Sequence, residues 1–89
     1  MQNNITFAKD AFEEYLYWQI RDKKMLKKIN IMLKEIQRTP FEGIGKPEAL
    51  KGELSAYWSR RINDKDRLVY QVKEQGIIIL QCKGHYDDK

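Results

Sequence analysis

The chain has 89 residues, of which 42% are hydrophobic and 34% charged, with a formal net charge of +4. This length fits a single domain spanning residues 1–89, and the composition excludes a disordered chain. It holds no apolar run of the roughly 18 residues that a membrane span needs, and its polar start does not resemble a signal peptide, so we expect a cytoplasmic protein.

The basic charge fits a polyanionic partner such as RNA, but it is weak evidence because many basic proteins bind no polyanion. The one cysteine, Cys82, excludes an internal disulfide. It follows an apolar run, which predicts a buried structural thiol. With one histidine and one cysteine the chain cannot build a zinc site from these ligands alone, and we expect no metal and no cofactor.

The first half of the chain predicts a short strand and two helices. Residues 4–7 form the strand and residues 9–21 the first helix, with one face made of Phe12, Tyr15, Leu16 and Gln19. Asp22 caps a second helix over residues 23–38, which Pro40 ends. The apolar residues of this helix follow a three-and-four spacing: Leu26, Ile29, Leu33 and Ile36.

A Gly/Pro-rich loop over residues 39–47 separates the helices from three predicted strands, at residues 54–62, 67–72 and 77–80. The third strand is apolar on both faces, which predicts a central position in the sheet. The order β-α-α-β-β-β predicts an α+β fold with two helices on one face of a mainly antiparallel sheet. The other face is then open to a partner.

Large aromatic side chains are most simply explained as core. This interpretation applies to Phe12, Trp58 and Tyr70.

Cleavage of RNA without a metal needs a base for the ribose 2′-hydroxyl, a fixed cation for the phosphate and an acid for the departing 5′-oxygen. Glu48 follows the loop and carries a carboxylate that can accept a proton. Arg67 is the first residue of a predicted strand, and its guanidinium carries a permanent positive charge. His85 titrates near neutral pH and suits the acid, and Tyr86 could donate a hydrogen bond or stack on a base.

Each of these residues also has a purely structural interpretation. Glu48 could be a solvated loop charge, Arg67 could pair with Asp64 or Asp66 across the turn, and His85 could be a surface residue at the end of the chain. The order of residues alone does not show that Glu48, Arg67 and His85 meet in space. Composition and periodicity therefore lead only to a basic α+β domain with possible RNA binding.

Several runs of residues resemble the YoeB/Txe family of RelE-like toxins, in the order of that family and over nearly the whole chain. These runs are Glu14-Tyr15-Leu16-Tyr17-Trp18-Gln19, Arg38-Thr39-Pro40-Phe41-Glu42-Gly43, Gly45-Lys46-Pro47-Glu48, Trp58-Ser59-Arg60-Arg61-Ile62, Arg67-Leu68-Val69-Tyr70 and His85-Tyr86.

The resemblance implies a ribosome-dependent endoribonuclease that cuts mRNA in the ribosomal A site. By position, Glu48 matches the general base of the family, Arg67 the residue that stabilises the phosphate, His85 the general acid and Tyr86 the closing tyrosine. Basic residues near this site are expected to hold the RNA: Lys51 and Arg61 by match to the family, and Arg60 and Lys46 as auxiliary contacts.

The resemblance also implies partners: the ribosome, a cognate antitoxin of the YefM/Axe kind and a second copy of the chain in a homodimer. The alternative is a basic module that binds RNA or the ribosome and blocks translation without catalysis. Two departures from the family are a tail, Asp87-Asp88-Lys89, which could repel a phosphate or be harmless, and Ala8 where the family often has a serine helix cap.

Overall fold

The computed structural model describes residues 3–51 and 57–84. Its elements are β1 (Asn4–Phe7), α1 (Lys9–Arg21), α2 (Lys23–Arg38), β2 (Glu48–Ala49), β3 (Tyr57–Arg61), β4 (Arg67–Lys73) and β5 (Gly76–Gln81). The predicted first strand, the two helices and the predicted strands at residues 67–72 and 77–80 are therefore confirmed. The strand predicted at residues 54–62 is confirmed over Tyr57–Arg61, and residues 54–56 lie outside the described residues. The short β2, at the end of the Gly/Pro-rich loop, was not predicted, since two residues carry no periodic signal.

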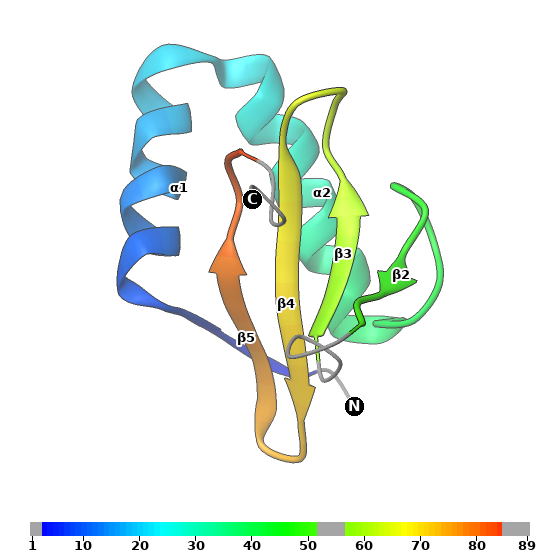
Figure 1. Ribbon diagram of the computed structural model, residues 1–89. Helices are drawn as coiled ribbons and strands as arrows, with labels where there is room; N and C mark the ends of the chain where they lie inside the picture. The colour runs from blue at the N-terminus through cyan, green and yellow to red at the C-terminus, as the bar shows by residue number, and fades with distance from the viewer. Residues whose placement is uncertain (1–2, 52–56, 85–89) are drawn as a thin grey trace.

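The five strands form one mixed sheet in the order β1-β5-β4-β3-β2. β1 runs parallel to β5 and the other neighbours are antiparallel. Both helices cover the same face, with α2 behind β3 and β4 in Figure 1 and α1 beside β5. The interior position of β5 agrees with the sequence-based expectation. The two helices leave the second face of the sheet uncovered, although Ser59 and Val69 at its centre are buried.

Helix α2 follows the predicted pattern closely. The Asp22 side chain accepts a hydrogen bond from the Met25 backbone N–H at 3.2 Å, which caps the first turn. Ile29 and Ile36 are fully buried, and Met32, which the pattern did not include, is buried between them. These side chains pack against the helix-facing residues of the sheet, which include Leu68, Tyr70, Ile77 and Ile79.

The face of α1 that packs against the core is not the predicted face, although Tyr15 of that face does pack against the core. Its buried residues are Ala11 and Trp18, whereas Phe12 is 48% exposed and Leu16 36% exposed. The helix covers only the β5 side of the sheet, and the Trp18 indole donates a hydrogen bond to the Cys82 carbonyl at 2.9 Å. This anchor turns the helix so that the Trp18 side chain points inward and Phe12 leaves the core.

Cys82 is fully buried at the end of β5, as expected. Burial raises the pKa of its thiol to about 12, with a further contribution from the carboxylate of Glu14. No helix in the described residues is long and apolar enough to cross a membrane.

Candidate functional site

The main chain of the Gly/Pro-rich loop between α2 and β2 is held in place by one arginine side chain, that of Arg60 on β3. Arg60 lies on β3 on the helix side of the sheet and has no exposed surface. Its guanidinium donates to three backbone carbonyls of the loop, those of Thr39 (2.8 Å), Glu42 (2.9 Å) and Ile44 (3.1 Å). A buried guanidinium that satisfies carbonyls in this way fixes the backbone that leads into Glu48.

Two side chains complete the environment of Arg60. Its Nε donates to the Tyr70 hydroxyl at 3.0 Å, and its Nη1 forms an ion pair with Glu35 on α2 at 2.5 Å. The Tyr70 hydroxyl in turn donates to the Pro40 carbonyl at 2.6 Å. Arg60 therefore belongs to the scaffold of the loop, and its expected role as an auxiliary RNA contact does not agree with its burial.

The strand pattern carried a signal for this burial. Trp58 and Ile62 point toward the helices, and Arg60 stands between them with the same parity, so alternation places it on the same face. Its charge favoured the opposite prediction, an exposed side chain, because arginine is rarely buried unless it is paired.

The Glu35 carboxylate has a lowered pKa. Partial desolvation acts to raise it, but hydrogen bonds from the Ile44 N–H and from Arg60, together with the positive charge of Arg60, outweigh that effect. The Ile44 N–H lies 2.8 Å from the carboxylate oxygen. Glu35 thus stays ionised while it ties the loop to α2.

Glu48 lies on the open face of the sheet, in β2. It is the antiparallel partner of Ser59 on β3, and Ser59 is the partner of Val69 on β4. Directly paired residues of an antiparallel sheet share a face, so Glu48 points away from the helices. Its side chain is exposed to solvent.

Arg61 and Arg67 lie on this same face, offset from Glu48 by one side-chain repeat along the strands, or about 7 Å. Arg61 is on the strand next to that of Glu48, and Arg67 is one strand further, about 10 Å across the sheet. They are direct partners across β3 and β4. Arg61 is exposed and Arg67 half-buried. Two guanidinium groups placed opposite each other repel, and this arrangement favours an anion between them.

The Arg67 guanidinium is held by the turn between β3 and β4. Its Nη1 donates to the carbonyls of Asn63 (2.6 Å) and Asp66 (3.1 Å). It forms no ion pair with a carboxylate of the described residues, so pairing with Asp64 or Asp66 is not what fixes it. The two carbonyls hold one edge of the guanidinium and leave its position fixed relative to the turn.

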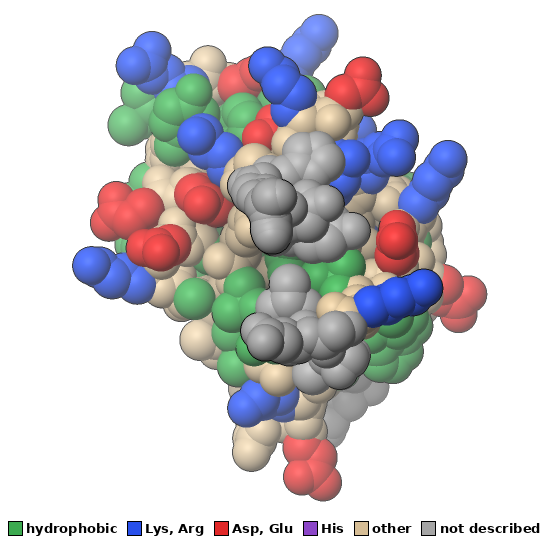
Figure 2. Space-filling view, viewed as in Figure 1, with side chains coloured by type: hydrophobic (Ala, Val, Ile, Leu, Met, Phe, Trp, Pro, Cys, Tyr) green, Lys and Arg blue, Asp and Glu red, His purple; other side chains and the backbone are tan. Residues whose placement is uncertain are grey.

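A hollow of about 320 Å³ adjoins this row of arginines. Lys46, Arg61 and Lys28 contribute to its lining, so two of the expected RNA-binding residues share one concave surface. Lys46 has a positive φ of 51°, which few residues other than glycine adopt and which turns its side chain at the end of the loop. Figure 2 shows Lys and Arg side chains around the upper ends of β3 and β4 on this face.

Lys28 was not among the expected site residues. It lies on α2, and its ammonium donates to the Ile62 carbonyl at 2.5 Å, across 34 positions of sequence. Only the packing of α2 against β3 brings it to this hollow, and no local pattern could have indicated it.

The remaining expected residues are placed as follows. Lys51 is exposed just after β2. His85 and Tyr86 lie outside the described residues, as do Asp87, Asp88 and Lys89. Gly84, the last described residue, accepts a hydrogen bond from the Arg67 backbone N–H at 2.9 Å.

The described residues contain no group of three His, Cys, Asp or Glu side chains that could hold a metal ion. What the open face offers is a carboxylate near two guanidinium groups, a set suited to proton transfer and to anion binding.

The comparisons of this chain with protein families, with related sequences and with solved structures all indicate the same family. The model of YoeB-like toxins of bacterial type II toxin–antitoxin systems matches residues 7–86. The chain is similar to a toxin YoeB of Synechocystis, with 51% identity over 92% of this chain and 95% of the relative.

Two solved structures from Staphylococcus aureus have the same fold. A YoeB dimer has a TM-score of 0.88 and 56% identity, covering 97% of this chain and all of that one. A YoeB–YefM complex has a TM-score of 0.86 and 55% identity, with the same coverage.

Proposed function

Since the chain belongs to the YoeB-like toxins of bacterial type II toxin–antitoxin systems, we propose that it is an endoribonuclease that cleaves mRNA in the ribosomal A site without a metal ion. The observation that carries this proposal is the placement of Glu48, Arg61 and Arg67 on one open face, in neighbouring rows of the sheet. The attack of a ribose 2′-hydroxyl on phosphorus needs a base for the hydroxyl proton and positive charge beside the phosphate, and a carboxylate with two guanidinium groups supplies both.

In the proposed reaction Glu48 accepts the proton of the ribose 2′-hydroxyl, and the oxygen attacks the adjacent phosphorus. Arg67 stabilises the charge that builds on the phosphate oxygens, because its guanidinium is permanently positive and is held in place by the carbonyls of Asn63 and Asp66. His85 protonates the departing 5′-oxygen, assisted by Tyr86. The products are a 2′,3′-cyclic phosphate and a free 5′-hydroxyl.

The RNA backbone is bound by the basic residues around this face. Arg61 and Lys46 share the hollow beside the site, and Lys51 is exposed next to β2. Lys28 contributes positive charge to the same hollow. Arg60 is left out of this set because its guanidinium is committed to the loop.

The proposed partners are the ribosome with its mRNA, which places the activity in the cytoplasm, an antitoxin similar to YefM, and a second copy of the chain. The S. aureus relatives, a YoeB dimer and a YoeB–YefM complex, support the last two. An acidic antitoxin segment that folds on binding fits the net charge of +4.

The test is cleavage of a defined message on purified ribosomes programmed with it, followed by primer extension. We expect new 5′ ends at the A-site codon with the wild-type protein. Arg67→Met is expected to lower the single-turnover rate by about 100-fold or more, because it removes a preorganised cation. Lys73→Met removes the same charge from the far end of β4 and is the matched control.

A message with a 2′-deoxyribose at the attacking position is expected to stay intact, because the nucleophile is missing. Halted translation on uncut mRNA would instead identify a non-catalytic blocking module. Full activity of a folded Arg67→Met protein would remove Arg67 from the mechanism.

A further inference from the structure

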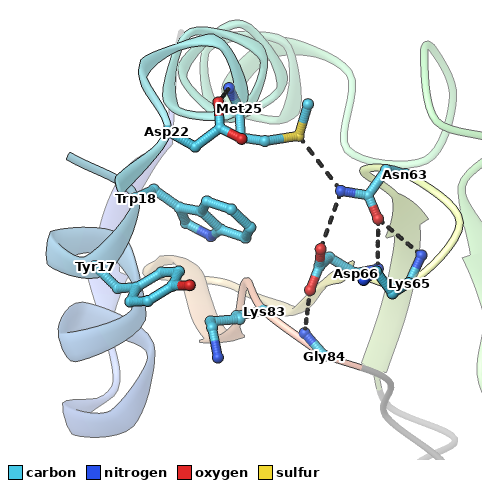
Figure 3. A pocket seen from close by; sticks show the side chains of 9 residues that line it. All are labelled: Tyr17, Trp18, Asp22, Met25, Asn63, Lys65, Asp66, Lys83 and Gly84. Carbon is cyan, nitrogen blue, oxygen red and sulfur yellow. Dashed lines mark hydrogen bonds between the residues drawn. The ribbon is translucent and has the colours of Figure 1, made fainter. Parts of the chain in front are cut away.

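The turn between β3 and β4 is held by a dense set of side-chain hydrogen bonds. The Asn63 side chain accepts from the backbone N–H groups of Lys65 (2.7 Å) and Asp66 (2.8 Å). Its amide donates to the Asp66 carboxylate at 3.0 Å (Figure 3). Asn63 thereby fixes both the main chain and the side chain of Asp66.

The second oxygen of that carboxylate reaches the end of the described chain. Asp66 Oδ1 accepts from the Gly84 backbone N–H at 2.7 Å, as Figure 3 shows. The Gly84 carbonyl accepts from the Arg67 backbone N–H at 2.9 Å and from the Gln81 side chain at 2.7 Å. Both polar groups of Gly84 are thus bound to the beginning of β4 and the end of β5.

The space on the Cβ side of Gly84 is open among the described residues. Apart from its chain neighbours, none of them has a heavy atom within 4 Å of the position that a Cβ would occupy there. A hollow of about 540 Å³ lies beside it, lined in part by Tyr17, Trp18 and Lys83 (Figure 3). Three hydrogen bonds therefore hold the main chain of Gly84 at the edge of this hollow.

The same turn also supports the cation of the proposed site. The carbonyls of Asn63 and Asp66 accept both hydrogen bonds of Arg67 Nη1. One four-residue turn therefore fixes the guanidinium that faces the phosphate and the glycine that directly precedes His85 in the sequence.

We propose that Asp66 is a positioning residue of this ribonuclease site, an inference that rests on the proposed function. Its carboxylate, held by Asn63, fixes Gly84 beside the first residue of β4 and so sets the point at which the chain leaves toward His85. Gln81 assists through the Gly84 carbonyl. Asp66 does not touch the reacting atoms; it acts through the position of Gly84 and through the turn that holds Arg67.

The test compares three variants in the programmed-ribosome assay with circular dichroism as a check of folding. Asp66→Ala is expected to lower kcat about tenfold with KM within twofold of wild type, since a hydrogen bond to a charged acceptor is lost while the RNA-binding cations remain. Asp66→Asn keeps an oxygen that can accept from Gly84 and is expected to recover most of the rate. Asp64→Ala removes the same charge from the same turn and is expected to cleave at least as fast as wild type.

A measurement independent of activity follows the Gly84 amide by NMR. In the wild type it is expected to be downfield-shifted and slow to exchange, and in Asp66→Ala it is expected to lose both properties. If Asp66→Ala does not fold, Gln81→Met, which lies outside the turn, removes the other side-chain bond to Gly84 and is expected to lower kcat with KM preserved.

The outcomes separate the two proposals. Wild-type protein that leaves every message uncut overturns the proposed function, and the positioning role falls with it. Wild-type cleavage with an equally fast, folded Asp66→Ala protein overturns the positioning role alone. An equal loss of rate in Asp64→Ala would show that charge, not the bond to Gly84, is responsible, and would overturn it as well.

Discussion

At the scale of single residues, Arg60 shows how burial changes the meaning of a basic side chain. Its five hydrogen bonds reach the loop, Tyr70 and Glu35. A free arginine at this position would be a natural RNA contact. Buried and fully bonded, it holds the main chain that leads into Glu48.

Replacement of Arg60 by Met is expected to lower the free energy of unfolding by about 3 kcal/mol, because three loop carbonyls and Glu35 lose their donor. Urea denaturation followed by circular dichroism measures this change. Arg61→Met, at the exposed neighbouring position, is the matched control and is expected to change stability by less than about 0.5 kcal/mol. Equal denaturation midpoints for the two variants would contradict a structural role for Arg60.

Cys82 illustrates a buried group whose chemistry is suppressed. With its pKa raised to about 12 by burial, the thiol is protonated at pH 8 and does not act as a nucleophile. We expect no reaction with a disulfide reagent such as DTNB in the native protein at pH 8, and one equivalent of reactive thiol after unfolding in urea. Rapid labelling of the native protein would show that the thiol is accessible.

At the scale of elements, the loop between α2 and β2 is the part whose shape is least evident from local pattern. A Cβ at Gly43, where φ is +128°, would lie 2.1 Å from the Glu35 carboxylate, so the close approach of loop and helix requires glycine. Glu35 then accepts from Ile44 and Arg60 at the same time. The position of the loop, and of β2 after it, therefore depends on the negative charge of the Glu35 carboxylate.

The sensitivity predicts a pH dependence. Because the folded-state pKa of Glu35 is lowered, its contribution to stability is fully present above the unfolded value near 4.5 and is lost as the pH falls through the folded value. We expect the free energy of unfolding to fall from pH 6 to pH 3 by a larger amount in the wild type than in Glu35→Gln, which has no proton to gain there. Identical pH profiles for the two proteins would show that this carboxylate is not stabilised by folding.

At the scale of the whole molecule, the helices cover one face of the sheet and leave the other for function. The polar residues Glu48, Arg61 and Arg67 come from three strands and gather on the uncovered face. The outer side of α1 is also unusual, since Phe12 and Ile20 are 48% and 80% exposed. Exposed apolar side chains of this size are compatible with association.

The proposed homodimer rests on the similarity of the chain to the S. aureus YoeB dimer. We expect size-exclusion chromatography with light scattering to give twice the 10.7 kDa mass of the chain at micromolar concentration. A monomer throughout the micromolar range would refute the dimer without affecting the fold or the site.

The sequence by itself determined the two helices, the strands other than β2, their order along the chain and the family. Apolar periods of 3.6 and 2 are local properties, so α2, β4 and β5 could be placed from them, and the motifs around Glu48 and Arg67 indicated the toxin family that the comparisons show. The residues that α1 buries could not be settled in this way, because a helix face is chosen by what packs against it. Strand alternation does place Arg60 on the helix side of the sheet, but only the structure shows the partners that make its burial possible.

Only the tertiary structure decided which distant residues share a surface. The pairing of β2 with β3 and of β3 with β4 brings Glu48 beside the two arginines, and the packing of α2 brings Lys28 to the same hollow. The bond between Asp66 and Gly84 spans 18 positions and no local pattern predicts it. The physical reason is that strand register and helix packing are set by the whole core at once, whereas a sequence pattern reports only what a residue's neighbours along the chain favour.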